Sequence, residues 1–322
     1  MIKLFIRNKY ETAVKEIDKK IIEVTQTNNK LISEAVTDLV ASGGKRLRPI
    51  MVGLASSFGK VEEEKILEIA AGIEILHMAT LVHDDIIDEA ELRRGEVTAQ
   101  KRYGKKMAVF IGDYLLSSIN SVFERQLSSA SRVKLNKIVR MICEGEIKQF
   151  QNKYNYNITI NQYLKRIRRK TALLFGLSTY LGAYESKVKD KKLHHLYNVG
   201  LEMGMAFQIQ DDILDFTGNK EVVGKKLGQD LISGVYTLPV ILLLHNEEYR
   251  KKVINIVSDK SKLENDFDYL ANMISDSNVL KQSKELARRF IDKARYHLEE
   301  LPDNEAKDYL HKIIDKQLGR KF

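Results

Sequence analysis

Two groups of three aspartates have the residue type and the spacing to bind a metal ion. Each follows the pattern DDxxD, the first at Asp84, Asp85 and Asp88 and the second at Asp211, Asp212 and Asp215. On a helix, residues i, i+1 and i+4 lie close together, so each group presents three carboxylates to one small volume. Oxygen-only ligands suit Mg²⁺, which is commonly held by carboxylates together with a substrate phosphate. One group alone would also fit a solvated acidic helix end, but two with apolar neighbours predict a metal site and a phosphorylated substrate.

Several cations have the placement needed to bind phosphate. Residues 43–49 read GGKRLRP, where glycines allow close backbone approach and Lys45 and Arg48 can reach one phosphate. Arg93 and Arg94 follow the first aspartate group and can either clamp two phosphates or pair with the aspartates. Lys170 and Thr171 stand at the end of a basic run, 165–170, most of which we expect on a solvated face.

Two histidines precede the first aspartates. His77 lies two helical turns before Asp84 on roughly the same side, where a satisfied core histidine is the usual alternative to a ligand. His83 adjoins Asp84 and raises the alternative of a His-Asp metal phosphohydrolase. The other five histidines show no matched metal-binding spacing, which weakens that alternative.

Helices must position these groups. Apolar residues recur three and four apart through most of the 322 residues, only three prolines occur, and no stretch alternates convincingly as a strand would. We therefore predict an all-α fold without a sheet, in a single domain spanning 1–322. The longest apolar run, 238–244, is far shorter than the ~20 residues of a membrane span.

Composition indicates a globular protein in a reducing compartment. Hydrophobic residues make up 43% and charged residues 30% of the chain, and the net charge of +9 suggests an anionic partner. Cys143 is the single cysteine, and we expect a buried structural thiol. No signal peptide is visible, so a soluble cytoplasmic protein is expected. Basic-aromatic recognition motifs are absent, which argues against nucleic-acid binding.

These motifs, taken in order, resemble those of the trans-polyprenyl diphosphate synthases. The resemblance runs nearly end to end and includes GGKRLRP at 43–49, both DDxxD groups, the RRG at 93–95, Lys170-Thr171, Gln208, and Gly224-Lys225. It implies the isoprenoid synthase fold, in which antiparallel helices surround a deep central cavity. It also implies Mg²⁺ as cofactor, with three ions when substrate is bound, and no protein nucleophile.

The resemblance also assigns a role to each matching position. Isopentenyl diphosphate would be bound by Lys45, Arg48, His77 and Arg94. The allylic diphosphate would be bound by Arg93, Lys170, Thr171, Gln208 and Lys225. All six aspartates would bind metal, and Asp84, Asp85, Asp88, Asp211, Asp212, Lys170 and Lys225 would act in catalysis.

Small residues before the first aspartates predict a long product. Ala79 stands where short-chain relatives place an aromatic, and Thr80 beside it is also a modest side chain. Leu76 and Ile73 lie deeper on the same helix, roughly 16 Å from Asp84 to Ile73. The alternative is that Ala79 merely allows close helix packing. An open channel implies a long all-trans product, heptaprenyl by preference, for a menaquinone side chain.

One departure from the family pattern concerns assembly. Many relatives have a lysine where this chain has Val235, and long-chain members with a separate small subunit resemble it in lacking that lysine. The expected partner is therefore a small non-catalytic subunit, with a homodimer as the alternative and transient membrane contact for product release. The remaining alternatives are a homomeric hexa- to octaprenyl synthase, a terpene cyclase and a non-catalytic helical partner subunit.

Overall fold

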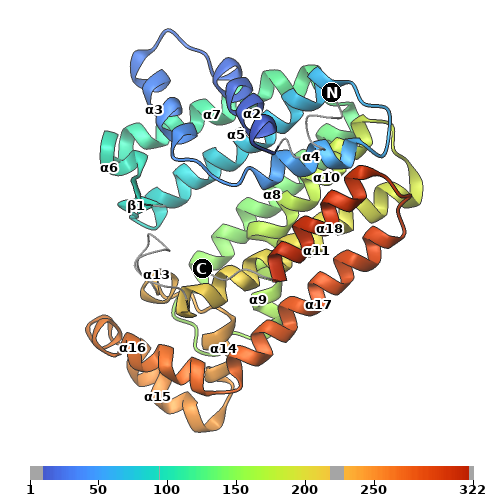
Figure 1. Ribbon diagram of the computed structural model, residues 1–322. Coiled ribbons are helices and arrows are strands. Elements are labelled where there is room, and N and C mark those ends of the chain that lie inside the picture. The colour runs from blue at the N-terminus through green and yellow to red at the C-terminus, as the bar shows by residue number, and fades with distance from the viewer. Residues whose placement is uncertain (1–9, 94, 218–227, 319–322) are drawn as a thin grey trace. The chain divides into compact units, whose positions relative to one another are not determined.

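The protein is almost entirely helical in the computed structural model, which describes residues 10–93, 95–217 and 228–318 (Figure 1). This confirms the all-α prediction. Two predicted site residues, Arg94 and Lys225, lie outside the described residues.

The chain divides into two compact units, and each is built from separate stretches of sequence. Unit 1 comprises Met1–Lys137, Phe175–Gly200 and His297–Lys312, and unit 2 comprises Ile138–Leu174, Leu201–Tyr296 and Ile313–Phe322. The divisions fall inside helices rather than in linkers. The sequence predicted one domain with a central cavity. Both statements concern the two units taken together and stay predictions.

Unit 1 is organised around one long helix, α5 (Glu63–Ile87). It packs against three other helices, α2 (Tyr10–Val24), α4 (Leu47–Ser56) and α7 (Lys105–Gln126). Ile66, Ile69 and Ile73 of α5 are at most 1% exposed, and each such side chain contributes about 1.5–3 kcal/mol of burial free energy. The remaining described helices that lie wholly or partly in unit 1 are α3 (Lys30–Ala41), α6 (Ala99–Tyr103), α8 (Ser129–Gln151), α10 (Leu173–Glu185), α11 (Asp190–Thr217), α17 (Val279–Glu299) and α18 (Glu305–Leu318).

The helix α5 is also, by length and composition only, able to cross a membrane, and 72% of the window concerned is buried inside the protein. The sequence prediction, which took 238–244 as the best candidate, was wrong on this point. Two glutamates, Glu68 and Glu74, interrupt the apolar run of α5 in the sequence. Both are buried and paired with arginines in the structure. The core helix of a soluble protein passes the same length and composition test.

Unit 2 holds the C-terminal parts of α8 and α11 and a set of shorter helices. These are α9 (Ile160–Ile167), the π-helical turn η1 (Arg168–Ala172), α13 (Gln229–Ile232), α14 (Leu238–Leu244), α15 (Glu247–Val257), α16 (Lys260–Asp276) and most of α17. The apolar run 238–244 forms α14, which starts after Thr237 with Pro239 in its first turn. Its side chains are mostly buried, so this run is a core helix of unit 2.

Two sequence predictions outside the site are corrected by the structure. A two-stranded antiparallel hairpin, β1 (Leu92–Arg93) with β2 (Glu96–Val97), follows α5, whereas no sheet was expected. Strands of two residues are too short to show an alternating pattern, and Gly95 at φ 83° lies in the turn between them. Cys143 is exposed rather than buried. Its neighbour Ile142 takes the buried position on α8, and one residue further places Cys143 on another side of the helix.

Candidate active site

The predicted phosphate cradle is the loop between α3 and α4. Gly43 and Gly44 both have positive φ, at 72° and 148°, so this turn suits residues without a Cβ. Lys45 is exposed, and its backbone carbonyl accepts a hydrogen bond from the Tyr10 hydroxyl. The guanidinium of Arg48 lies 4.5 Å from the centre of the Phe175 ring, which limits the directions in which that cation can point.

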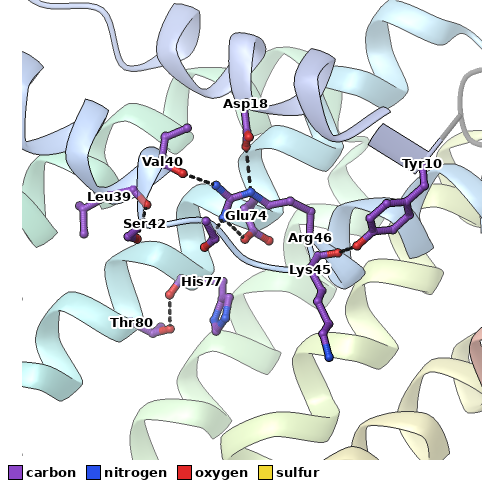
Figure 2. A network of polar contacts seen from close by, with 11 residues as sticks. Tyr10, Asp18, Leu39, Val40, Ser42, Lys45, Arg46, Glu74, His77 and Thr80 are labelled. Carbon is purple, nitrogen blue, oxygen red and sulfur yellow. Dashed lines mark hydrogen bonds and ion pairs between the residues drawn. The ribbon is translucent and has the colours of Figure 1, made fainter. Parts of the chain in front are cut away.

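His77 lies beside the cradle, on α5. Figure 2 shows His77 and the end of the Lys45 side chain on the same side of the loop, away from Asp18. The His77 backbone carbonyl accepts a hydrogen bond of 2.7 Å from the Thr80 hydroxyl. Unit 1 therefore brings Lys45 and His77, two of the predicted isopentenyl diphosphate ligands, to one region.

The first aspartate group lies at the C-terminal end of α5. The helix ends at Ile87 and Asp88 is its C-cap, so the group occupies the last helical turn as its spacing predicts. Asp84 is half-buried, Asp85 is 5% exposed and Asp88 is exposed. The three carboxylates therefore differ in access to solvent, with Asp88 the most open.

Arg93 from the hairpin binds the middle aspartate. Its Nε donates to both Asp85 carboxylate oxygens at 2.8 and 3.1 Å, and its terminal nitrogen lies 2.7 Å from Oδ1. Gln100 also holds this turn, since its side-chain amide donates to the Asp85 backbone carbonyl at 2.7 Å. Arg93, a predicted ligand of the allylic diphosphate, is therefore ion-paired with Asp85.

The second aspartate group lies in the last turns of α11, within unit 2. Its middle member, Asp212, is 4% exposed. The fully buried hydroxyl of Tyr163 donates to Asp212 Oδ2 at 2.6 Å, and the Gln208 side chain donates to Oδ1 at 2.8 Å. Thr171 in turn donates to Gln208 Oε1 at 2.6 Å. Three predicted site residues, Thr171, Gln208 and Asp212, therefore form one continuous network with Tyr163.

Burial is the largest influence on the pKa of the Asp212 carboxyl. Loss of solvent raises the pKa of the Asp212 carboxyl to about 7, and the donors Tyr163 and Gln208 oppose that shift. The pKa of the Tyr163 hydroxyl is raised well above its usual range, by burial first and then by the neighbouring Asp212. The Tyr163 hydroxyl therefore stays protonated near neutral pH and can donate its hydrogen bond to Asp212.

Lys170 lies in the π-helical turn η1. Such turns widen the helix by one residue and are frequent at functional sites. Lys170 Nζ is 3.6 Å from Glu146 Oε2 of α8. Gly145, beside Glu146, allows the approach, because a Cβ there would stand 2.7 Å from the Cβ of Arg169. The turn thus places Lys170 and Thr171 in unit 2 with Gln208.

The four predicted chain-length residues all lie on α5. At about 100° per residue, Ala79, Leu76, Thr80 and Ile73 spread over about 120° of the helix circumference and so share one side. Ala79 and Ile73 are fully buried, Leu76 is 3% exposed and Thr80 is half-buried. Their role in setting product length stays a prediction.

His83 has a packing role that accounts for its position. Its ring lies against α7, where a Cβ on Gly112 would come within 2.3 Å of the His83 Nε2 atom. The same nitrogen is 3.4 Å from Asp113 Oδ1. Among the described residues no three His, Cys, Asp or Glu side chains gather to hold a metal by themselves. These contacts favour a structural histidine over the phosphohydrolase alternative.

The residues of the aspartate groups fit a magnesium ion that is shared with a phosphorylated substrate. Asp84 with Asp88, and Asp211 with Asp215, offer carboxylates one helical turn apart, and Mg²⁺ is usually held by one or two carboxylates plus phosphate. The middle members have protein partners at their carboxylate oxygens, Arg93 at Asp85 and Tyr163 with Gln208 at Asp212. Asp215 likewise accepts a hydrogen bond of 3.1 Å at Oδ1 from the Gly228 backbone N–H. Metal binding by all six aspartates stays a prediction.

Sequence reasoning missed two anchors near the predicted site, the buried Tyr163 and the half-buried Arg166. Tyr163 belongs to no motif, and the spacing of Ile160, Tyr163 and Ile167, three and four apart in α9, was its weak signal. Arg166 was expected on a solvated face, yet its guanidinium donates to the Tyr236 backbone carbonyl at 2.6 Å and lies 5.4 Å from the Tyr163 ring centre. That expectation was wrong for Arg166, because its partners come from a distant part of the chain.

Comparison with known proteins decides the family. Residues 29–274 match the polyprenyl synthetase family. The chain belongs to this family. The expectation of a prenyl-transferring enzyme is thereby confirmed at the level of the family.

Relatives and solved structures agree along nearly the whole chain. Component 2 of the heptaprenyl diphosphate synthase of Geobacillus stearothermophilus is 37% identical, over 92% of this chain and 92% of its own. A geranylgeranyl diphosphate synthase of Saccharolobus solfataricus is 31% identical over 91% of each chain, so the names of relatives differ in product length.

Two crystal structures match with a TM-score of 0.92. One is a heptaprenyl diphosphate synthase from Staphylococcus aureus, 33% identical, covering 97% of this chain and 98% of that one. The other is a polyprenyl synthase from Caulobacter crescentus in complex with calcium and isoprenyl diphosphate, 30% identical, covering 99% and 98%. The predicted isoprenoid synthase fold is thus confirmed for this family member.

Proposed function

We propose that this polyprenyl synthetase condenses isopentenyl diphosphate with an allylic diphosphate such as farnesyl diphosphate, and that it makes a long all-trans polyprenyl diphosphate. The observation that carries the proposal is the presence of two DDxxD groups on helices α5 and α11 in a chain of this family. A terpene cyclase normally carries a different second motif, which disfavours that alternative. Intact aspartates argue against a non-catalytic subunit.

Each unit supplies groups for one part of the chemistry. Unit 1 offers Lys45, Arg48 and His77 for the isopentenyl diphosphate. Unit 2 offers Lys170, Thr171 and Gln208 for the allylic diphosphate, to which Arg93 of unit 1 would also bind. Arg94 and Lys225 complete the proposed set from outside the described residues.

The proposed mechanism is electrostatic. Bound Mg²⁺ would supply positive charge that stabilises the departing diphosphate. Lys170 and Arg93 would hold the same leaving group and so favour its ionisation. Arg93 must first turn from Asp85 towards the substrate, or bridge both. The isopentenyl double bond then attacks the allylic carbon, and loss of a proton completes the elongation without any protein nucleophile.

We propose heptaprenyl as the product, for a menaquinone side chain. The small side chain of Ala79 on α5 and the relatives named for a heptaprenyl product support this length. Hexaprenyl to octaprenyl products remain alternatives, because relatives at similar identity are named for other lengths.

A second subunit is the proposed partner. Support comes from relatives named as component 2 and from Val235, which is buried where many relatives have a lysine. On α8, Cys143, Ile147 and Phe150 are exposed, and the last two are 60% and 66% exposed. An apolar stripe of this kind is typical of a subunit interface. A homodimer, the alternative assembly, would also cover this stripe. We further propose a cytoplasmic location, with brief membrane contact during product release.

The test is product analysis with purified protein. Farnesyl diphosphate, isopentenyl diphosphate and Mg²⁺ are incubated with the chain, alone and with a candidate small subunit, and products are separated by chromatography. Elongation of farnesyl diphosphate by four isoprene units gives the heptaprenyl product. Elongation to another length would correct the product, whereas no elongation under either condition would overturn the proposed function.

A further inference from the structure

Arg46, the second cation of the GGKRLRP segment, faces the interior of unit 1. Its side chain is 3% exposed, whereas the neighbouring Lys45 is exposed. In Figure 2 the Arg46 guanidinium lies between Asp18 and Glu74, while the Lys45 side chain extends away from them. Lys45 and Arg46, adjacent cations in one short loop, therefore have different surroundings, which suggests different roles.

The Arg46 guanidinium joins the loop to three helices. Nε donates to Asp18 Oδ1 of α2 at 2.8 Å, and one terminal nitrogen donates to Glu74 Oε1 of α5 at 3.0 Å. The other terminal nitrogen donates to the Val40 carbonyl of α3 at 3.0 Å. A weaker contact of 3.4 Å reaches the Gly43 carbonyl. A planar guanidinium suits this forked arrangement, which an ammonium group cannot reproduce.

The backbone at Arg46 adopts a left-handed conformation, which is strained in any residue that has a Cβ. Its φ of 39° and ψ of 36° lie in the left-handed region, and it is the N-cap of α4 without a side-chain capping bond. Non-glycine residues adopt this conformation only where surrounding contacts hold them there. The buried pair with Glu74, whose side chain is 6% exposed, supplies such contacts.

The partner of Arg46 is also close to a proposed substrate ligand. Glu74 precedes His77 by three residues on α5, so both lie on one side of the helix about one turn apart. Arg46 is bonded to that turn of α5, and Lys45 and Arg48 are its near neighbours in the loop. One buried ion pair thus couples the loop cations to His77.

We propose that Arg46, through Glu74 and Asp18, is a positioning residue that holds the 43–48 loop in the shape needed to bind isopentenyl diphosphate. Arg46 itself does not contact the substrate. The inference rests on the proposed function and adds to it a determinant of affinity for one of the two substrates. Pre-formed geometry lowers the ordering cost of binding, so its loss is expected to weaken binding.

The central experiment replaces the pair together. Arg46→Met alone would leave Glu74 buried without its counter-charge, which is strongly destabilising, whereas exchanging both partners of a buried pair for apolar residues is often tolerated. The double variant Arg46→Met/Glu74→Met is compared with Arg125→Met/Glu68→Met. The latter removes another α5 ion pair of unit 1, at 2.5 Å and away from the loop. Arg46→Lys is a second test variant, which keeps the charge without the fork.

The measurements are the KM for each substrate, the dissociation constant for isopentenyl diphosphate by calorimetry, and the thermal midpoint. We expect both Arg46 variants to raise the KM and the dissociation constant for isopentenyl diphosphate about tenfold, with the allylic KM within twofold of the parent. The control pair should leave both KM values within twofold. Equal changes in the two KM values, or none, would overturn the inference.

The design separates this inference from the proposed function. If the parent binds isopentenyl diphosphate without elongating any allylic substrate, the proposed function fails, and the calorimetric comparison still decides the role of Arg46. If the parent elongates and the Arg46 variants bind isopentenyl diphosphate as the parent does, the inference alone fails. A parent that binds no isopentenyl diphosphate would overturn both.

Discussion

At the residue scale, the two middle aspartates show why a repeated motif need not have six equivalent ligands. Asp85 and Asp212 are both at most 5% exposed, and each has charged or polar partners supplied by the protein. A buried carboxylate needs such partners, since an unpaired one would be costly. The spacing of DDxxD could be read from the sequence, and the pairing of Arg93 with an aspartate was one of the two alternatives that the sequence left open. The partner Tyr163 could not be read, because it lies 49 residues from Asp212 in the chain and meets it only through the fold.

The Tyr163 hydroxyl can be tested by deletion. Tyr163→Phe removes the donor to Asp212 Oδ2 and leaves the buried carboxylate with Gln208. The loss of this donor raises the pKa of Asp212 above about 7 and so favours the protonated form, which binds metal less well, and we therefore expect roughly a tenfold fall in kcat at pH 7 and a lower thermal midpoint. Tyr269→Phe, at an exposed tyrosine of α16, serves as the control. Unchanged kcat together with an unchanged Mg²⁺ requirement would show that the network does not position the second aspartate group.

The small side chain of Ala79 gives a second prediction at this scale. Ala79→Phe adds an aromatic ring to the side of α5 that also carries Leu76, and a ring there should block the growing tail. We expect products shorter by two or more isoprene units, measured by chromatography with farnesyl diphosphate as primer. Because Ala79 is fully buried, the thermal midpoint must be recorded to confirm folding. A folded variant with the parent's product would instead assign Ala79 to helix packing.

At the element scale, helices α5 and α11 were the most readable parts of the sequence, because long apolar spacing and the absence of proline indicate helices directly. The loop conformation at Arg46 was unreadable, since it depends on Asp18 and Glu74 from other elements. The exposed Cys143 and the hairpin after α5 were missed for local reasons. A shift of one residue along α8 decides whether a side chain is buried, and strands of two residues carry no alternating pattern. Periodicity therefore predicted which elements exist, and tertiary contacts decided which way individual side chains face.

Glu185 shows how a distant side chain can fix a helix start. Its carboxylate accepts from the backbone N–H and the hydroxyl of Ser128, at 2.9 and 2.8 Å, just before α8, and it pairs with Lys65 of α5 at 2.8 Å. Burial alone would raise the pKa of the Glu185 carboxyl, but these donors together hold it below its ordinary value.

The lowered pKa of Glu185 determines how stability depends on pH. A depressed pKa means that the unfolded chain binds the proton more readily, so the stabilisation is present above the unfolded pKa of about 4.3 and is lost as the pH falls through the folded value. We expect Glu185→Gln to reduce the free energy of unfolding by about 1–3 kcal/mol at pH 7. The difference from the parent should shrink as the pH falls below about 4. Urea unfolding across that range measures it, and a constant difference would contradict the assignment.

Close helix packing in unit 1 gives a prediction that is independent of charge. A Cβ at Gly182 of α10 would lie 2.0 Å from the backbone carbonyl oxygen of Val52 in α4, and neither backbone can move aside easily. We expect Gly182→Ala to destabilise the protein by about 2–4 kcal/mol, or to prevent folding. The exposed Ser117 of α7 provides the control, since Ser117→Ala should change stability by less than about 0.5 kcal/mol. A Gly182→Ala protein as stable as the parent would show that the α4–α10 contact is looser than described.

At the scale of the whole molecule, the proposed reaction requires both aspartate groups, although one belongs to unit 1 and the other to unit 2. If Mg²⁺ and a diphosphate bind to both groups, then the ligands together should stabilise the folded protein more than either alone. A ligand at 100 times its dissociation constant adds about 2.7 kcal/mol. We therefore expect the thermal midpoint to rise by several degrees with Mg²⁺ plus inorganic diphosphate, and little with Mg²⁺ alone. Chelation of the metal should reverse the rise.

Variants in each unit separate joint binding from binding at one group. Asp84→Asn and Asp211→Asn each remove one charge from one group, and each should abolish most of the rise if the diphosphate and its metal ions are held by both. Asp276→Asn, at an exposed position of α16, should leave the rise intact. A rise that survives in either aspartate variant would mean that a single unit binds the metal diphosphate, and the proposed catalytic arrangement would then lose its basis.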